Sequence, residues 1–95
     1  MTRGDREPPW LVILAPAAQR QLRRLPPRDA ARARAPIMAL ALDPRPSGAA
    51  RLHGTDFLRV RSGDLRIVYA IDDIAREVVV LRVARRSEST YRRIT

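Results

Sequence analysis

The sequence predicts an α+β fold with the element order β-α-α-β-β-β, in which two helices pack on one face of an antiparallel sheet. Two observations lead to this prediction. Apolar residues recur at helical spacing in the first half of the chain and alternate with polar residues after Gly54. Prolines, glycines and paired aspartates stand between the periodic segments, where turns are expected. Ninety-five residues without cysteine, 45% of them hydrophobic, suffice for one domain with an aliphatic core.

The chain begins with a polar, proline-tipped segment, residues 1–9, which we expect to be mobile and to precede a single domain over residues 10–95. The domain opens with Trp-Leu-Val-Ile-Leu at residues 10–14, a run of strand-forming residues that predicts a buried strand. This apolar run is too short for a signal-peptide core or a membrane span, so a cytoplasmic protein is expected.

Two helices are predicted next. Pro16 suits the first turn of a helix over residues 16–25, which ends at a pair of prolines. One face of this helix is apolar and carries Ala18, Leu22 and Leu25. The second helix is predicted over roughly residues 29–42, and Pro36 should kink it or delay its start.

Three strands are predicted after Gly54. They cover residues 57–61, 65–71 and 77–84. The turn-forming residues between them predict an antiparallel meander. The last strand is nearly all apolar, which predicts an interior position in the sheet.

Strict alternation places arginines on the sheet face that the helices leave uncovered. The side facing the helices carries Leu58, Val60, Leu65, Ile67 and Tyr69. Arg59, Arg61 and Arg66 then project from the opposite face. Arg82 and Arg85 are an odd number of residues apart, so strict alternation puts them on opposite faces of the last strand. At most one of them can then join the arginines on the uncovered face. Such a face suits a nucleic acid, although the ordinary outward charges of a half-buried sheet give the same pattern.

The charge balance favours a polyanionic partner. All 19 basic residues are arginine, and only 10 residues are acidic, which gives a net charge of +9. A GC-rich genome would explain the absence of lysine but not the excess of bases. Such an excess predicts nucleic acid or an acidic protein segment as the partner, and arginine suits phosphate because it donates two parallel hydrogen bonds. A membrane is less expected, because the sequence has no basic amphipathic helix with bulky apolar residues.

Three stretches of the sequence resemble the RelE family of bacterial toxins: residues 51–54, 58–73 and 83–92. The most specific motifs are Gly-Asp-x-Arg-Ile-Val-Tyr at 63–69 and Arg-Arg-Ser-x-x-x-Tyr at 85–91. The resemblance runs from about Trp10 to Arg92, and the family's RelE-like fold agrees with the predicted element order.

The resemblance implies the toxin of a toxin–antitoxin pair. A RelE-type member is a ribosome-dependent endoribonuclease that cuts translated mRNA without a metal or other cofactor. A cognate antitoxin neutralises it, so the antitoxin and the ribosome with bound mRNA are the implied partners. The related ParE branch shares the fold but acts by binding DNA gyrase and is not a nuclease, which is the alternative function.

The resemblance also assigns roles to individual residues. The implied catalytic residues are Arg66, Arg85 and Tyr91. The implied RNA- and phosphate-binding residues are Arg59, Arg61 and Arg86. The tail spacing differs from the family pattern by about one residue, so Arg86 competes with Arg85 for the same role. Phe57 stands where the best-known family members have a basic residue.

The implied chemistry is attack of a ribose 2′-oxygen on the adjacent phosphorus. With one histidine in the chain, the usual histidine pair is impossible. Tyr91 could orient or deprotonate the 2′-hydroxyl, while Arg59 and Arg66 hold the phosphate oxygens. Arg85 is the nominal acid, although a guanidinium with a pKa above about 12 suits electrostatic stabilisation better than proton donation.

Five other residues have structural explanations. His53 has no partner histidine and is expected to be structural or solvated. Asp72 and Asp73 are expected to form a turn rather than a metal site. Tyr69 should lie in the core with its hydroxyl at the sheet edge, and Trp10 in the core or at an antitoxin contact.

Overall fold

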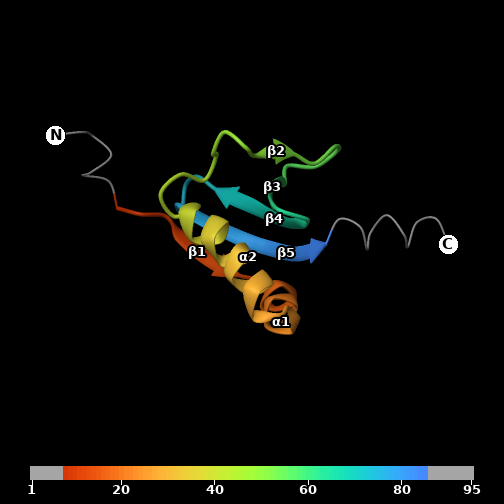
Figure 1. Ribbon diagram of the computed structural model, residues 1–95. Coiled ribbons are helices and arrows are strands. Elements are labelled where there is room, and N and C mark those ends of the chain that lie inside the picture. The colour runs from red at the N-terminus through yellow and green to blue at the C-terminus, as the bar shows by residue number, and fades with distance from the viewer. Residues whose placement is uncertain (1–7, 86–95) are drawn as a thin grey trace.

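The computed structural model describes residues 8–85, and within this range it contains two helices and a five-stranded sheet (Figure 1). The elements in chain order are β1 (Leu11–Leu14), α1 (Pro16–Arg24), α2 (Pro27–Ala39), β2 (Ala50–Arg51), β3 (Leu58–Ser62), β4 (Leu65–Asp72) and β5 (Glu77–Arg85). The predicted α+β class and RelE-like fold are confirmed, and the short strand β2 is one element more than the sequence predicted. Of the predicted mobile segment, residues 1–7 lie outside the described range.

The sheet is mixed, which corrects the predicted antiparallel sheet in one detail. Its strand order is β1-β5-β4-β3-β2, and β1 runs parallel to β5 while the other neighbours are antiparallel. β1 pairs with β5 because the apolar last strand needs a neighbour on both sides, and the meander supplies only β4. The predicted interior position of the last strand is therefore confirmed.

Both helices begin at a proline, and α1 also ends before one, as the sequence predicts for α1. Pro16 is at the start of α1, and the helix ends before Pro26. α2 begins earlier than expected, at Pro27, and continues through Pro36. Pro36 has no N–H to donate to the carbonyl of Arg32 four residues earlier. The Ser62 hydroxyl on β3 donates to that carbonyl instead, at 3.0 Å, so the sheet satisfies the acceptor that the proline leaves open.

The core lies between the helix pair and one face of the sheet (Figure 1). Its buried members from the helices are Ala18, Leu22, Ala33 and Ile37, and those from the sheet are Val60, Leu65, Ile67, Tyr69, Val78, Val80 and Val83. The alternation predicted for β3 and β4 is thus confirmed, because the odd residues of β4 face the helices. No helix in the described part of the chain is long and apolar enough to cross a membrane.

Candidate anion-binding face of the sheet

Arginines from β3 and β4 lie on the sheet face turned away from the helices. Arg59 pairs across the sheet with Val68, and Arg61 pairs with Arg66. Residues that pair directly across neighbouring strands point to the same face. Two arginines opposite each other destabilise a sheet, so their presence on one face favours a role in binding an anion.

Arg82 of β5 joins these residues because of an irregularity in the sheet. Tyr69 pairs with Val80 but Val68 pairs with Arg82, so Leu81 is an extra residue on β5. This β-bulge shifts the alternation of β5 by one residue. Val78 and Val80 face the helices before the bulge, and after it Arg82 faces away from them.

The arginine side chains border a small hollow on this open face. Its volume is about 140 Å³ and it is lined by Leu52, Arg66, Val68, Arg82 and Ala84. Val68, next to both arginines, is 9% exposed and is part of an apolar floor. Within residues 8–85, no carboxylate forms an ion pair with Arg59, Arg66 or Arg82. Their guanidinium groups are therefore available to donate to phosphate oxygens.

Arg85, one of the three predicted catalytic residues, lies on the opposite side of the sheet from Arg66. It pairs across the sheet with Leu65, a core residue, and so faces the helix layer. Its guanidinium donates to the carboxylate of Asp29 at the start of α2 and, at 3.0 Å, to that of Asp64 in the β3–β4 turn. These hydrogen bonds, above all the one to Asp29, raise the pKa of Arg85 above its usual value. The structure thus does not bring Arg85 together with Arg59 and Arg66.

The remaining residues singled out in the sequence either lie in turns or fall outside the described range. Tyr91 and Arg86 belong to the residues after 85, which the structure does not describe. His53 is exposed in the turn after β2. The Asp72 carboxylate accepts hydrogen bonds from the backbone N–H groups of Ile74 and Ala75, which confirms the predicted turn. No group of three or more possible metal ligands occurs within residues 8–85.

Two aromatic residues and one ion pair hold the ends of the sheet. Tyr69 is fully buried, as predicted, and its hydroxyl donates to the Pro44 carbonyl at 2.7 Å. Arg76 stacks on Trp10, with its guanidinium carbon 4.6 Å from the ring centroid. Asp73 forms a salt bridge with Arg45 at 3.0 Å, which joins the β4–β5 turn to the connection after α2. These contacts are structural and lie away from the hollow on the open face.

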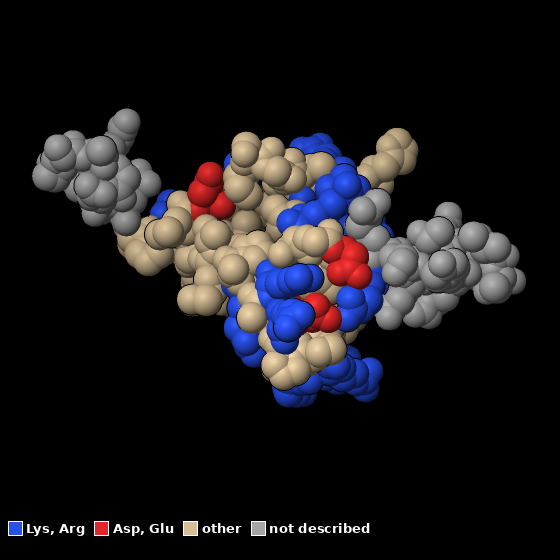
Figure 2. All heavy atoms as spheres, in the orientation of Figure 1, with Lys and Arg blue, Asp and Glu red and all other residues tan. Residues whose placement is uncertain are grey.

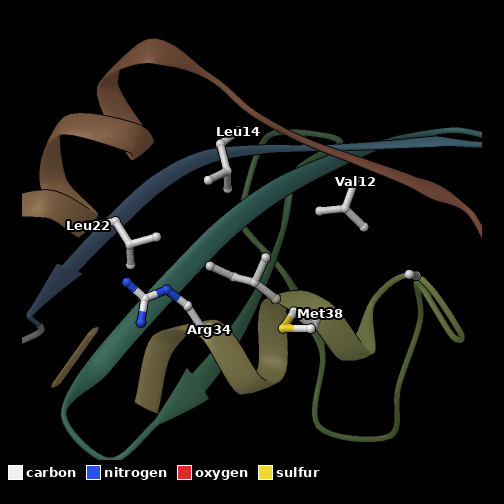
Figure 3. A pocket seen from close by; sticks show the side chains of 7 residues that line it. Val12, Leu14, Leu22, Arg34 and Met38 are labelled. Carbon is white, nitrogen blue, oxygen red and sulfur yellow. The ribbon is translucent and has the colours of Figure 1, made fainter. Parts of the chain in front are cut away.

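A second surface feature, an apolar groove, was not predicted from the sequence. It lies between β1 and the two helices, has a volume of about 350 Å³ and is shown in Figure 3. The side chains that line it are Val12, Leu14, Leu22, Arg34, Ile37, Met38 and Ala41. Local patterns could not reveal it because three separate elements form its walls. Its most exposed apolar residue is Met38, at 68%.

The helix layer around this groove is strongly basic. Figure 2 shows arginines gathered over the two helices, with acidic residues confined to a few spots on the visible face. The exposed arginines of the two helices are Arg20, Arg23, Arg24, Arg28, Arg32 and Arg34. Asp29 is the one acidic residue in α1 and α2. The protein thus has two cationic surfaces, one over the helices and one on the open face of the sheet.

Comparison with known proteins agrees with this architecture. Among solved structures, the toxin–antitoxin complex RelBE2 of Mycobacterium tuberculosis contains a chain with 28% sequence identity and a TM-score of 0.65, covering 86% of this chain and 97% of that one. The RelE–RelB complex of Pyrococcus horikoshii gives 24% identity and a TM-score of 0.72, with 81% and 94% covered. Isolated RelE of E. coli gives 19% identity and a TM-score of 0.70, with 90% and 99% covered.

These structures share the fold of the described domain. No curated protein matches the sequence. The family model for the ParE toxin of type II toxin–antitoxin systems matches residues 12–90, which is most of the chain. The protein therefore belongs to the ParE toxin family of type II toxin–antitoxin systems, within the RelE/ParE superfamily.

Proposed function

We propose that this toxin is a metal-independent endoribonuclease that cuts translated mRNA on the ribosome. The observation that carries the proposal is the open face of the sheet, where Arg59, Arg66 and Arg82 surround an apolar floor. Guanidinium groups in such a place can bind an RNA backbone, because phosphate contacts supply most of the affinity for nucleic acids.

In the proposed reaction, the ribose 2′-oxygen attacks the adjacent phosphorus and the 5′-oxygen of the next nucleotide leaves. The products are a 2′,3′-cyclic phosphate and a free 5′-hydroxyl. Arg59 and Arg66 hold the phosphate oxygens and stabilise the charge that develops on them. Tyr91, assigned by its place in the tail motif, orients or deprotonates the 2′-hydroxyl.

The two carboxylates around Arg85 argue against its predicted role as the acid. They hold the guanidinium in its charged form and occupy its donors, so the side chain has little capacity to give a proton to the leaving oxygen. Arg86, which competes with Arg85 in the tail motif, is the better candidate for the tail arginine. Its charge would stabilise the leaving 5′-oxygen, which takes its proton from water. Electrostatic help without a strong acid also fits an enzyme whose substrate is positioned by the ribosome.

We further propose a cognate antitoxin as the partner of this chain. Relatives of the same fold have been solved in complex with their antitoxins. The apolar groove between β1, α1 and α2 would bind the apolar face of an amphipathic segment. The arginines around it would favour acidic residues on the flanks of that segment.

The alternative is a toxin that binds DNA gyrase without nuclease activity, and the match to the ParE family model favours it. Induced expression separates the two functions. A nuclease leaves breaks inside translated frames with 2′,3′-cyclic phosphate ends, and purified ribosomes stimulate the cleavage. A gyrase-binding toxin leaves transcripts intact while supercoiling by purified gyrase is inhibited.

Two variants make the test specific to the open face. Arg66→Ala should slow cleavage by roughly 100-fold, comparable to the loss of one transition-state donor. Arg20→Ala is the matched control, because it removes the same charge from the exposed surface of α1. Intact mRNA during complete growth arrest would exclude the nuclease, and equal cleavage by both variants would exclude the open face as its site.

A further inference from the structure

The resemblance to the RelE family assigns roles to Arg59 on β3, to Arg66 on β4 and to arginines of the tail. It assigns no role to any residue of β5 before Arg85. The structure places Arg82 of β5 beside the first two. Arg59, Val68 and Arg82 form one row across three neighbouring strands. Since adjacent strands are about 4.8 Å apart, the backbones of the two arginines lie about 10 Å apart on either side of Val68.

Arg82 is also a neighbour of Arg66. Arg66 pairs with Ala84, and Arg82 lies two residues before Ala84 on the same face of β5. Diagonal neighbours of this kind are within reach of long side chains. Both arginines line the same hollow, so their guanidinium groups border one small space above Val68.

The two arginines of β5 therefore have different roles. The bulge at Leu81 turns Arg82 towards the open face, while Arg85 faces the helix layer and is paired with Asp29 and Asp64. Within residues 8–85 Arg82 has no carboxylate partner. Two cations that share a hollow repel each other, and an anion between them relieves this repulsion.

We infer that Arg82 binds the RNA backbone together with Arg66, so that the hollow above Val68 holds one phosphate between two guanidinium groups. This makes Arg82 a phosphate-binding residue of the toxin, while Arg85 fixes the end of β5 to α2 and to the β3–β4 turn. The inference rests on the proposed function, because it names a further residue of the same RNA-binding face.

The test measures binding of a single-stranded RNA with 2′-O-methyl groups, which cannot be cleaved because the attacking hydroxyl is blocked. Fluorescence anisotropy gives the Kd over a series of salt concentrations. Arg82→Ala should weaken binding about tenfold, as expected for loss of one charge-assisted contact. The slope of log K against log salt should fall by about 0.7, the contribution of one phosphate contact on a single strand.

Three further variants make the result specific. Arg82→Lys keeps the charge but not the fork, so it should retain the salt slope and recover part of the affinity. The double variant Arg66→Ala/Arg82→Ala should lose less than the sum of the two single losses, because both side chains hold one phosphate. Arg20→Ala, which removes a charge from α1, should bind as the wild type does.

The outcomes separate this inference from the proposed function. If Arg66→Ala weakens binding while Arg82→Ala behaves like Arg20→Ala, Arg82 is a solvated surface charge and the inference is overturned, but the RNA-binding face remains. If the wild type does not bind the RNA, or if Arg66→Ala, Arg82→Ala and the double variant all bind it as tightly as the wild type does, the open face is not an RNA surface. Both the inference and the proposed function then fail. Arg82 is exposed, so its replacement should leave the Tm unchanged, which circular dichroism checks.

Discussion

Removing one hydroxyl group, in the variant Tyr69→Phe, should destabilise this domain measurably. Tyr69 is fully buried in β4, and its hydroxyl donates to the carbonyl of Pro44, itself buried, at 2.7 Å. The bond joins the connection after α2 to the sheet. Phenylalanine fills the same space but leaves the carbonyl without its partner, at a cost of about 1–3 kcal/mol.

This cost can be converted into a change in melting temperature. In a domain of about 60–100 residues, each kcal/mol lowers the Tm by about 4–8 °C, so a cost of about 1–3 kcal/mol should lower the Tm by roughly 4–24 °C. Thermal denaturation followed by circular dichroism measures it. Thr55→Val is the control, because it also removes a hydroxyl that donates to a backbone carbonyl, that of Leu52. This hydroxyl also accepts from the Phe57 N–H, but both bonds lie at an exposed position where water replaces them.

The pH dependence of stability gives a second, independent measurement on the same residue. Burial raises the pKa of Tyr69 above its usual value, despite the nearby Arg45 guanidinium, which lowers it. As the pH rises, the Tyr69 hydroxyl therefore loses its proton in the unfolded chain first, at a pH of about 10. The contribution of this hydroxyl to the free energy of unfolding is complete below that pH and is lost as the pH rises through the pKa of the folded state. Tyr69→Phe should reduce the alkaline loss. Equal Tm values and equal alkaline profiles for the two proteins would refute the reasoning.

Three other changes test separate parts of the structure. Arg85→Ala and Asp29→Ala should each lower the midpoint of urea unfolding, and the double variant should lose less than their sum, because the two side chains form one ion pair. The hydrogen bond from the Arg45 guanidinium lowers the pKa of Asp73. The stability that this pair contributes is therefore present above a pH of about 4 and is lost as the pH falls. Asp73→Asn removes the titrating group, so the stability of this variant should fall less steeply at acid pH. Met38→Asp, in the apolar groove, should weaken binding of the co-expressed antitoxin without lowering the Tm, which affinity copurification and thermal denaturation together measure.

Local patterns were enough to predict most of the fold. Prolines mark both ends of α1 and the start of α2, and β3 and β4 alternate without interruption, so each of these elements could be located by its own residues. The parallel pairing of β1 with β5 could not be predicted, because nothing in the apolar run 11–14 indicates which strand will lie beside it. β2 was missed since two residues are too few to show a period.

The same contrast applies to the open face. Arg59 and Arg66 were placed correctly because their strands alternate strictly. The apolar groove was missed because its lining residues come from β1, α1 and α2. Where the order of residues along one element determines a surface, the sequence predicts it. Where separate elements meet, the packing has to be known first.

The bulge at Leu81 has the largest consequence for function, and alternation alone cannot locate it. With the buried residues Val78 and Val80 as the guide, regular alternation along β5 would turn Arg82 into the core and leave Val83 on the open face. Burying an unpaired guanidinium costs far more free energy than interrupting the hydrogen bonds between β4 and β5 at one residue. The extra residue in β5 is therefore the more stable arrangement. Val83 then fills the core, Arg82 joins Arg66, and Arg85 reaches Asp29. One irregular residue thus determines which arginine can meet a phosphate and which one holds the fold together.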